Sequence, residues 1–196
     1  MTFREQLKSP QLLMDLKQRA SVANFYYVVM ILIVLFADGY HGRHPGLANV
    51  LLFLILGISG VRAGMAILEQ FFAPRRVGPW LFLSSILLSG LFWGIGFACL
   101  LLQEGESHTL FLMVVCTVGL SAGGVLVYHP FLPLAIAYDL LLLGPGLVVM
   151  LGRPEYFSLI GVILVGSTYL GTMSHQANVA YWKALKNEEL LSKVVE

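Results

Sequence analysis

The sequence is poor in charge and in cysteine. Only 12% of its 196 residues are Asp, Glu, Lys or Arg, about half the roughly 25% of an ordinary soluble domain, while 58% are hydrophobic. The formal net charge of +1 excludes an extended nucleic-acid-binding surface. Its two cysteines, Cys99 and Cys116, cannot form a disulfide framework, and both fall in apolar stretches, where we expect small buried side chains.

In place of polar sequence the chain has six apolar stretches joined by short connections. A helix needs about 20 mostly apolar residues to cross roughly 30 Å of hydrocarbon. Helices satisfy their own backbone groups in lipid, and open sheets do not. We therefore predict an all-α polytopic membrane protein with a bundle of six transmembrane helices. The predicted spans are approximately residues 22–40, 47–68, 79–102, 109–127, 131–151 and 156–174.

Two flanking segments complete the predicted organisation. Residues 1–21 form an amphipathic lead with a short helix that starts at Ser9-Pro10, a capping side chain followed by a proline. Residues 175–196 form the start of a cytoplasmic signalling helix. No signal-peptide cleavage pattern follows the first apolar stretch, so we expect the first span to be retained.

The distribution of positive charge predicts the orientation. Nine Lys or Arg residues flank the spans on the side of the two termini, and only Arg43 and Arg153 flank them on the other side. Positively charged flanks are retained in the cytoplasm. Both termini are therefore predicted to be cytoplasmic, in a bacterial inner membrane.

Arg62 and Asp139 are the two charges placed well within predicted spans, and ionisable groups at such depth are functional candidates. The two lie at similar depths, so we predict a buried ion pair between the second and fifth spans. Glu69, seven residues after Arg62 on the same helix face, is an alternative partner. Trp93 and Tyr138 are the other candidates for contact with a ligand inside the bundle.

Glycine and proline patterns suggest how the helices pack. Gly-x-x-x-Gly spacing lets helix backbones approach closely, within the chain or, as the alternative, across a homodimer seam. Pro133 and Gly144-Pro145-Gly146 predict a kinked, broken fifth span that forms a ligand-facing wall. The three spaced pairs are Gly60 and Gly64, Gly90 and Gly94, and Gly119 and Gly123.

Three histidines on the outer side, His41, His44 and His108, lie near Asp38 and two glutamates of the connection between spans three and four. Such a cluster could bind a transition metal or titrate with pH, against the alternative of ordinary solvated loop histidines. No nucleophile, base and metal set gathers at one depth. We therefore expect no catalytic residues and no cofactor in this chain.

Several features together resemble a known group. They are the basic lead, Arg62 near the inner end of span two, Leu91-Phe92-Trp93-Gly94, the small-residue run Gly119 to Gly124, the prolines of span five and the tail pattern Ala184-Leu185-x-x-Glu188-x-Leu190-Leu191. This layout resembles the six-span N-terminal sensor regions of bacterial sensor histidine kinases and diguanylate cyclases. The resemblance implies an input module, followed by a kinase or cyclase domain that works as a dimer. The chain would then be a piece of a longer protein or a stand-alone anchor.

The expected function is therefore that of a transmembrane sensor. A small hydrophobic or ionic stimulus would change helix packing in the lipid bilayer and move the sixth span with its tail. The predicted face of a dimeric signalling helix is Tyr181, Leu185, Leu191 and Val195. The alternative is a small transporter or channel, with Arg62, Asp139 and the broken fifth span along its pathway.

Overall fold

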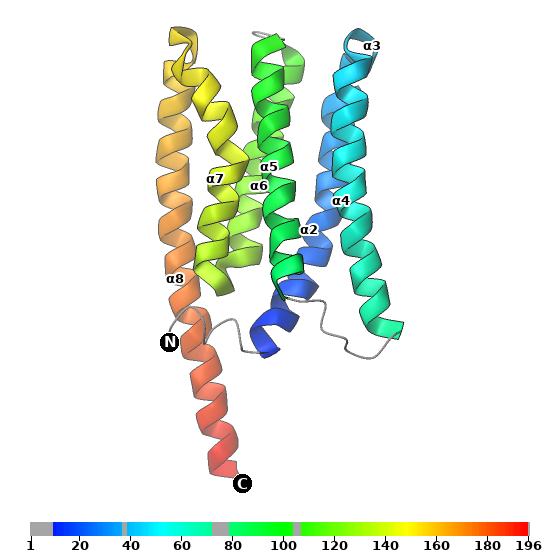
Figure 1. Cartoon of the computed structure of the whole chain (residues 1–196). Coiled ribbons are helices and arrows are strands. Elements are labelled where there is room, and N and C mark those ends of the chain that lie inside the picture. Colours follow the sequence, from blue (N-terminus) through cyan, green and yellow to red (C-terminus); the bar gives the residue numbers. More distant parts are fainter. Residues whose placement is uncertain (1–9, 37–38, 72–78, 104–106, 196) are drawn as a thin grey trace.

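The computed structural model describes residues 10–36, 39–71, 79–103 and 107–195 (Figure 1). Six long helices account for most of these residues, and no strand occurs in the described ranges. The long helices are α2 (Pro10–Phe36), α4 (Pro45–Phe71), α5 (Pro79–Gln103), α6 (His108–Tyr128), α7 (Leu132–Leu151) and α8 (Phe157–Val195). The short elements are α3 (Tyr40–Arg43) and the 3-10 turns η1 (His129–Phe131) and η2 (Pro154–Tyr156).

The all-α prediction is confirmed, and each predicted span corresponds to one long helix. Five uninterrupted helical segments are long and apolar enough to cross a membrane. One of them, His108–Leu151, contains both α6 and α7, which η1 joins directly, with a non-helical backbone at Phe131. The side chains of Ser121 on α6 and Asp139 on α7 are hydrogen-bonded, so η1 turns the chain back on itself.

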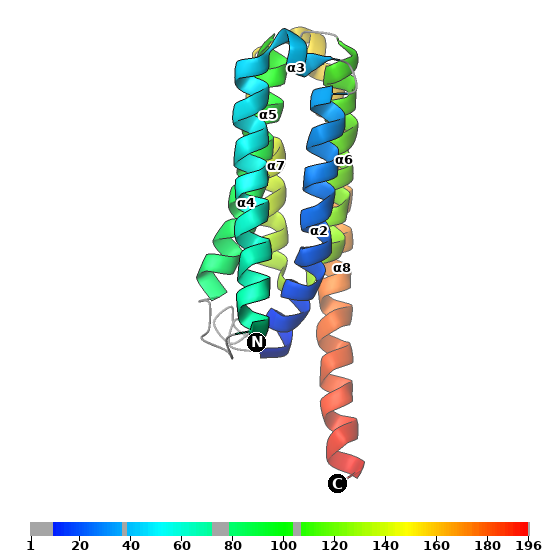
Figure 2. The ribbon, with the colours of Figure 1, turned by 90° about the vertical axis from the view of Figure 1, so that its right-hand side faces the viewer.

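The predicted lead is not a separate helix. α2 begins at Pro10, as the Ser9-Pro10 pattern indicates, and continues without interruption into the first apolar stretch. Ser9 itself lies outside the described residues. The first turns of α2 lean away from the axis of the rest of the helix (Figures 1 and 2).

The helices form a bundle in which each long helix packs beside two or more others. α2 lies against α4 and α6, whereas α7 packs against α5, α6 and α8. α2 begins and α8 leaves the bundle at the same end, which we call the tail end, while α3 lies at the other end (Figure 1). At the α3 end Arg153 donates a 3.0 Å hydrogen bond to the Leu101 carbonyl and so satisfies the end of α5.

Close packing of α5 on α7 depends on glycine. A Cβ atom added at Gly94 would lie 2.8 Å from the carbonyl oxygen of Leu142 and closer still to that of Leu141. A Cβ at Gly90 would lie 3.1 Å from the ring of Tyr138. The prediction of packing within the chain is therefore confirmed for this glycine pair.

The other two pairs do not show this packing. Built Cβ atoms at Gly60, Gly64 and Gly123 meet nothing within 4 Å among the described residues, and one at Gly119 only reaches the end of Met30 at 4.0 Å.

The prediction of a broken fifth span is wrong. α7 is helical from Leu132 to Leu151 with Pro145 inside it. Pro133 lies in the first turn of α7, where a backbone N–H has no helical partner to lose. The ring of Pro145 faces Gly94, since a Cβ there would lie 3.1 Å from the proline Cδ. The small partner leaves room for the ring between α5 and α7.

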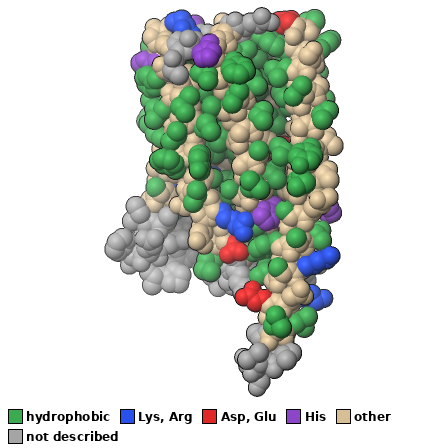
Figure 3. Space-filling view, turned by 180° about the vertical axis from the view of Figure 1, so that it is seen from behind, with side chains coloured by type: hydrophobic (Ala, Val, Ile, Leu, Met, Phe, Trp, Pro, Cys, Tyr) green, Lys and Arg blue, Asp and Glu red, His purple; other side chains and the backbone are tan. Residues whose placement is uncertain are grey.

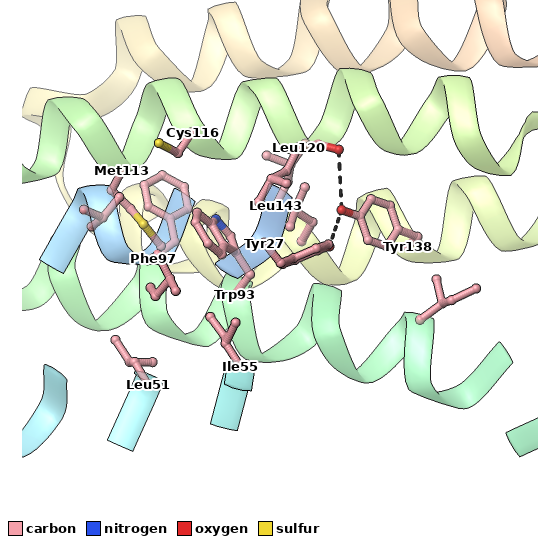
Figure 4. Close-up of a cluster of buried hydrophobic side chains, with 14 of the residues drawn as sticks. Tyr27, Leu51, Ile55, Trp93, Phe97, Met113, Cys116, Leu120, Tyr138 and Leu143 are labelled. Carbon is pink, nitrogen blue, oxygen red and sulfur yellow. Dashed lines mark hydrogen bonds between the residues drawn. The ribbon is translucent and has the colours of Figure 1, made fainter. Parts of the chain in front are cut away.

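Aromatic side chains fill the centre of the bundle (Figure 4). Trp93 is completely buried, and the ring of Tyr27 packs edge-on against it at 5.9 Å between centroids. The Trp93 indole Nε1 donates a 2.9 Å hydrogen bond to the Thr117 hydroxyl. Burial of an indole N–H with its partner is the expected arrangement. The surrounding buried side chains include Leu51, Ile55, Phe97, Met113, Leu120 and Leu143.

Candidate functional site

The two predicted intramembrane charges do not form a pair. Arg62 on α4 donates hydrogen bonds to Ser85 on α5 and Asn24 on α2, whereas Asp139 on α7 accepts a hydrogen bond from Ser121 on α6. α4 packs against α2 and α5, and α7 against α5, α6 and α8. The predicted ion pair is wrong, because similar depth in a bundle does not make two helices neighbours. The side chain of Glu69, the alternative partner, lies outside the described part of the chain.

Arg62 is a buried cation whose hydrogen-bond partners among the described residues are neutral. Only 6% of its surface is exposed. Its Nε donates to Ser85 Oγ at 3.2 Å and its Nη1 to Asn24 Oδ1 at 3.5 Å. Its Nη2 has no hydrogen-bond partner among the described residues. Both named partners are uncharged, so they leave the positive charge of the guanidinium uncompensated.

The neighbours of Arg62 are themselves held in place. Asn24 donates from Nδ2 to the Ser59 carbonyl at 3.0 Å, which directs its Oδ1 toward the guanidinium. Ser85 donates to the Phe82 carbonyl at 2.7 Å and therefore presents lone pairs to Arg62. The arginine is thus fixed by a three-helix polar network.

A cavity of about 490 Å³ adjoins Arg62 between α2 and α4. Its polar wall contains Arg62, Lys17, Asn24, Ser21 and Ser59, and no acidic residue is among the described residues that line it. The remaining wall is apolar or small: Ala20, Phe25, Val28, Leu56, Gly60, Ala63, Met65 and Phe82. The cavity therefore combines positive charge with hydrocarbon-like surface.

Asp139 borders a second, smaller cavity of about 240 Å³ between α7 and α8. Ser167, Thr168 and Ser174 of α8 also line it. Ser174 is 1% exposed, and its hydroxyl has no hydrogen-bond partner within the described ranges. This polar patch lies at the seam between α8 and the rest of the bundle.

Trp93 and Tyr138, the other predicted ligand contacts, belong to the core. The Tyr138 hydroxyl is hydrogen-bonded to that of Tyr27 and donates to the Leu120 carbonyl at 3.4 Å (Figure 4). Gly124 leaves room for its ring, since a Cβ there would lie 2.8 Å from Tyr138 Cδ1. Neither Trp93 nor Tyr138 lines the cavities at Arg62 and Asp139.

The base of the α8 tail is tied to the bundle by side chains that the sequence analysis did not connect. Asn178 donates from Nδ2 to the carbonyls of His129 and Pro130 at 2.8 and 3.0 Å. Tyr181 donates from its hydroxyl to Asp15 on α2 at 2.8 Å. We call these contacts the tail clamp. The clamp joins α2, η1 and α8 at the tail end.

The predicted signalling-helix face divides between two environments. Tyr181 packs toward the bundle, with its ring edge-on to His129 at 6.2 Å. Leu185 is half-buried, and Leu191 is 67% exposed. The side chain of Val195 lies outside the described part. The stripe is therefore not a uniform outward face in a single chain.

The three histidines at the α3 end contact aromatic and amide groups. His41 is hydrogen-bonded to Asn49 Oδ1 at 3.0 Å and stacks on Phe36, and His108 stacks on Phe111. No group of three His, Cys, Asp or Glu residues able to hold a metal ion occurs among the described residues. Asp38 and the two nearby glutamates fall outside them, so the metal site at His41, His44 and His108 stays a prediction.

Sequence reasoning missed Asn24 and Ser85 because a single polar residue in an apolar helix does not indicate which other helix supplies its hydrogen-bond partner. The one available signal was that an amide side chain within a span needs a hydrogen-bond partner.

Comparison of the chain with protein-family models, with curated proteins and with solved structures found no match.

Proposed function

We propose that this chain is the membrane-embedded sensory domain of a signal-transduction protein, in which a stimulus alters helix packing and α8 carries the change out of the bundle. The output would be a histidine kinase, with a diguanylate cyclase as the other possibility that the resemblance implies. The observation that carries the proposal is the continuity of α8. It extends from Phe157 to Val195 as one 39-residue helix, about 58 Å at 1.5 Å per residue.

The surface supports the membrane part of the proposal. Large apolar side chains are exposed on every long helix, for example Phe53 at 77%, Leu126 at 71% and Val165 at 72%. They cover the face seen in Figure 3 between two ends that carry charged and histidine side chains. A soluble protein would not expose so much contiguous apolar surface. Both described chain ends lie at the tail end, as expected for six passes with cytoplasmic termini (Figure 1).

α8 has the properties of a movable output element. In its most apolar stretch only 11% of the residues are buried, against 28–56% in the other candidate spans. The tail clamp connects it to the bundle through three hydrogen bonds, from Asn178 and Tyr181. Two packings of such an element that differ by a few kcal/mol are enough for a switch, provided that the stimulus binds them unequally.

A fusion protein tests this proposal. The chain is joined after Leu191 to the dimerisation and catalytic domains of a histidine kinase, and autophosphorylation is measured in membranes. Each alanine inserted at the junction rotates the kinase helix by about 100°. We expect activity to rise and fall with this rotation. Activity that stays flat over one to four inserted alanines would contradict signal transfer through α8.

Variants of the tail clamp provide the second arm of the same assay. Tyr181→Phe and Asn178→Ala each remove a bond between α8 and the bundle, so we expect both to shift basal kinase activity. Thr172→Ala is the matched control, because Thr172 is exposed and its hydroxyl donates to the Thr168 carbonyl within α8. Clamp variants that behave like this control would argue against coupling through the clamp.

The dimer is tested by cross-linking in membranes. In a chain with Cys99→Ser and Cys116→Ala, Leu191→Cys should give a disulfide-linked dimer. Lys186→Cys lies five residues earlier, about 140° around the helix, and should cross-link much less. Equal cross-linking at both positions would indicate random collision rather than a defined helix pair.

The transporter alternative expects its polar groups along one pathway. Arg62 and Asp139 border separate cavities, and α7 is unbroken. These observations favour the sensory proposal over transport.

A further inference from the structure

The positive charge of the buried Arg62 has no counter-charge among its described hydrogen-bond partners. A guanidinium carries five N–H donors and a fixed positive charge. Nε and Nη1 reach neutral oxygens, and Nη2 reaches none among the described residues. A buried cation without an anion is costly, because desolvation is not repaid by neutral partners.

Tyr128 does not solve this problem. Its ring belongs to the buried core, and it lies close enough to Arg62 for the two to interact electrostatically. Its hydroxyl and the guanidinium lie near each other, but their geometry is not that of a hydrogen bond. A side-chain rotation that joined the two would still leave Arg62 with an uncompensated charge, because a phenol is neutral.

The cavity beside Arg62 has the shape and chemistry of a site for a missing anion. Its volume of about 490 Å³ is within the roughly 300–1,000 Å³ of small-molecule sites. Lys17, which also has another interaction partner, lines the same wall. Lys17 precedes Asn24 by seven residues, about 10 Å along α2, so the positive wall extends toward the tail end.

The other part of the wall fits an alkyl chain. Phe25, Val28 and Leu56 line the cavity on the far side of Asn24 from Lys17. Phe25 is 68% exposed, so this part is continuous with the apolar outer surface of α2. A ligand with an anionic head at Arg62 could lay its chain along these residues and leave the end of that chain in the hydrocarbon.

We propose that the cavity between α2 and α4 binds a single-chain amphiphile with an anionic oxygen headgroup, a carboxylate or a phosphate, which compensates the positive charge of the Arg62 guanidinium on the cavity wall. Charge-assisted bonds from a guanidinium to such oxygens are among the strongest polar contacts in proteins. This site is independent of the sensory proposal, since binding can be measured on the chain without any output domain.

The test uses a palmitate analogue with a photoreactive diazirine near the end of its chain, added to the full chain in a neutral detergent. Cross-linked peptides are mapped by mass spectrometry. We expect labelling on α2 and α4 next to Phe25, Val28 and Leu56. Labelling spread evenly over all outward helix faces would overturn the proposal.

Competitors distinguish the possible sources of the anion. Unlabelled palmitate and a lysophosphatidate should both suppress the labelling. Hexadecanol, which has the same chain with a neutral head, should compete at least about tenfold less well, the factor that a lost charged hydrogen bond implies. Equal competition by hexadecanol, or full competition by acetate or inorganic phosphate at matched concentration, would each overturn the amphiphile assignment.

Two variants and a matched control locate the site. Arg62→Gln keeps a polar side chain but removes the charge, and it should reduce labelling about tenfold. Gly60→Leu places a side chain in the cavity without a clash, because its Cβ position is open. This variant should abolish labelling while Arg62 stays in place.

Gly123→Leu is the control on α6, with the same open Cβ position and no part in the cavity. It should label like the original chain. If Arg62→Gln does not fold, the comparison of Gly60→Leu with Gly123→Leu still tests whether the analogue binds in the cavity. Equal labelling of these two variants would overturn the proposal.

Discussion

Replacing Gly94 by alanine should destabilise the bundle, whereas the same replacement at Gly60 should not. At Gly94 the new methyl group would lie 2.8 Å from the Leu142 carbonyl oxygen, closer to that of Leu141, and 3.1 Å from the Pro145 ring. None of these atoms belongs to a flexible side chain. The clash can be relieved only by moving α5 and α7 apart. At Gly60 the same methyl group meets nothing within 4 Å.

The magnitude follows from two opposing contributions. Overpacking a tight contact costs about 1–3 kcal/mol of unfolding free energy. Alanine has a higher helix propensity than glycine by about 1 kcal/mol, measured in water, and this gain is common to both positions. The difference between the two variants therefore isolates the packing contribution. We expect Gly94→Ala to be less stable than Gly60→Ala by about 1–3 kcal/mol.

The measurement is unfolding of the purified protein in mixed micelles by a rising fraction of a denaturing detergent. Helix content and tryptophan emission report the transition, and Trp93 on α5 lies one residue before the substituted glycine. Equal midpoints for the two variants would refute the close approach of α5 and α7. So would a Gly94→Ala protein that is more stable than the original chain.

Two further predictions concern the buried polar groups, measured in the same unfolding assay. The changes in unfolding free energy caused by Arg62→Ala and Asp139→Asn should add within about 0.5 kcal/mol, because the two residues contact different partners. Ser121 and Asp139 share a hydrogen bond, so the changes caused by Ser121→Ala and Asp139→Asn should deviate from additivity by about 0.5–3 kcal/mol. Strong non-additivity between Arg62→Ala and Asp139→Asn would indicate that the two charges do interact. Trp93→Phe should cost about 0.5–1.5 kcal/mol for the lost bond to Thr117, beyond any effect of Trp80→Phe at an exposed site, and equal stability of the two would contradict that bond.

Helix number and helix ends were largely predictable from the sequence. A run of about 20 apolar residues between polar or proline-containing segments forms a helix because its backbone must bond internally once its side chains leave water. Pro10, Pro45 and Pro79 each begin a helix, where the missing N–H costs nothing. The lead was wrongly separated from the first span because its polar composition does not interrupt helical geometry.

The candidate site could be predicted only in part. Arg62 was recognised from its charge, but its partners Asn24 and Ser85 come from helices whose lateral order hydropathy does not encode. Helices that are apolar on all sides carry no stripe that points to a neighbour. The glycine pairs illustrate the same limit, because Gly90 and Gly94 contact α7 while Gly60 and Gly64 face open space with identical spacing.

The sequence by itself determined that this chain is a set of long apolar helices with a polar extension after the last one. The length and composition of each apolar run decide where the backbone must form its hydrogen bonds internally. Only the tertiary structure decided which helices touch. It separated Arg62 from Asp139, joined Tyr181 to Asp15 across 166 positions, and left a cavity beside an arginine that has no acidic partner among the described residues. The physical reason is that lateral packing depends on the shapes of facing surfaces, which arise only when helices far apart in the chain come together.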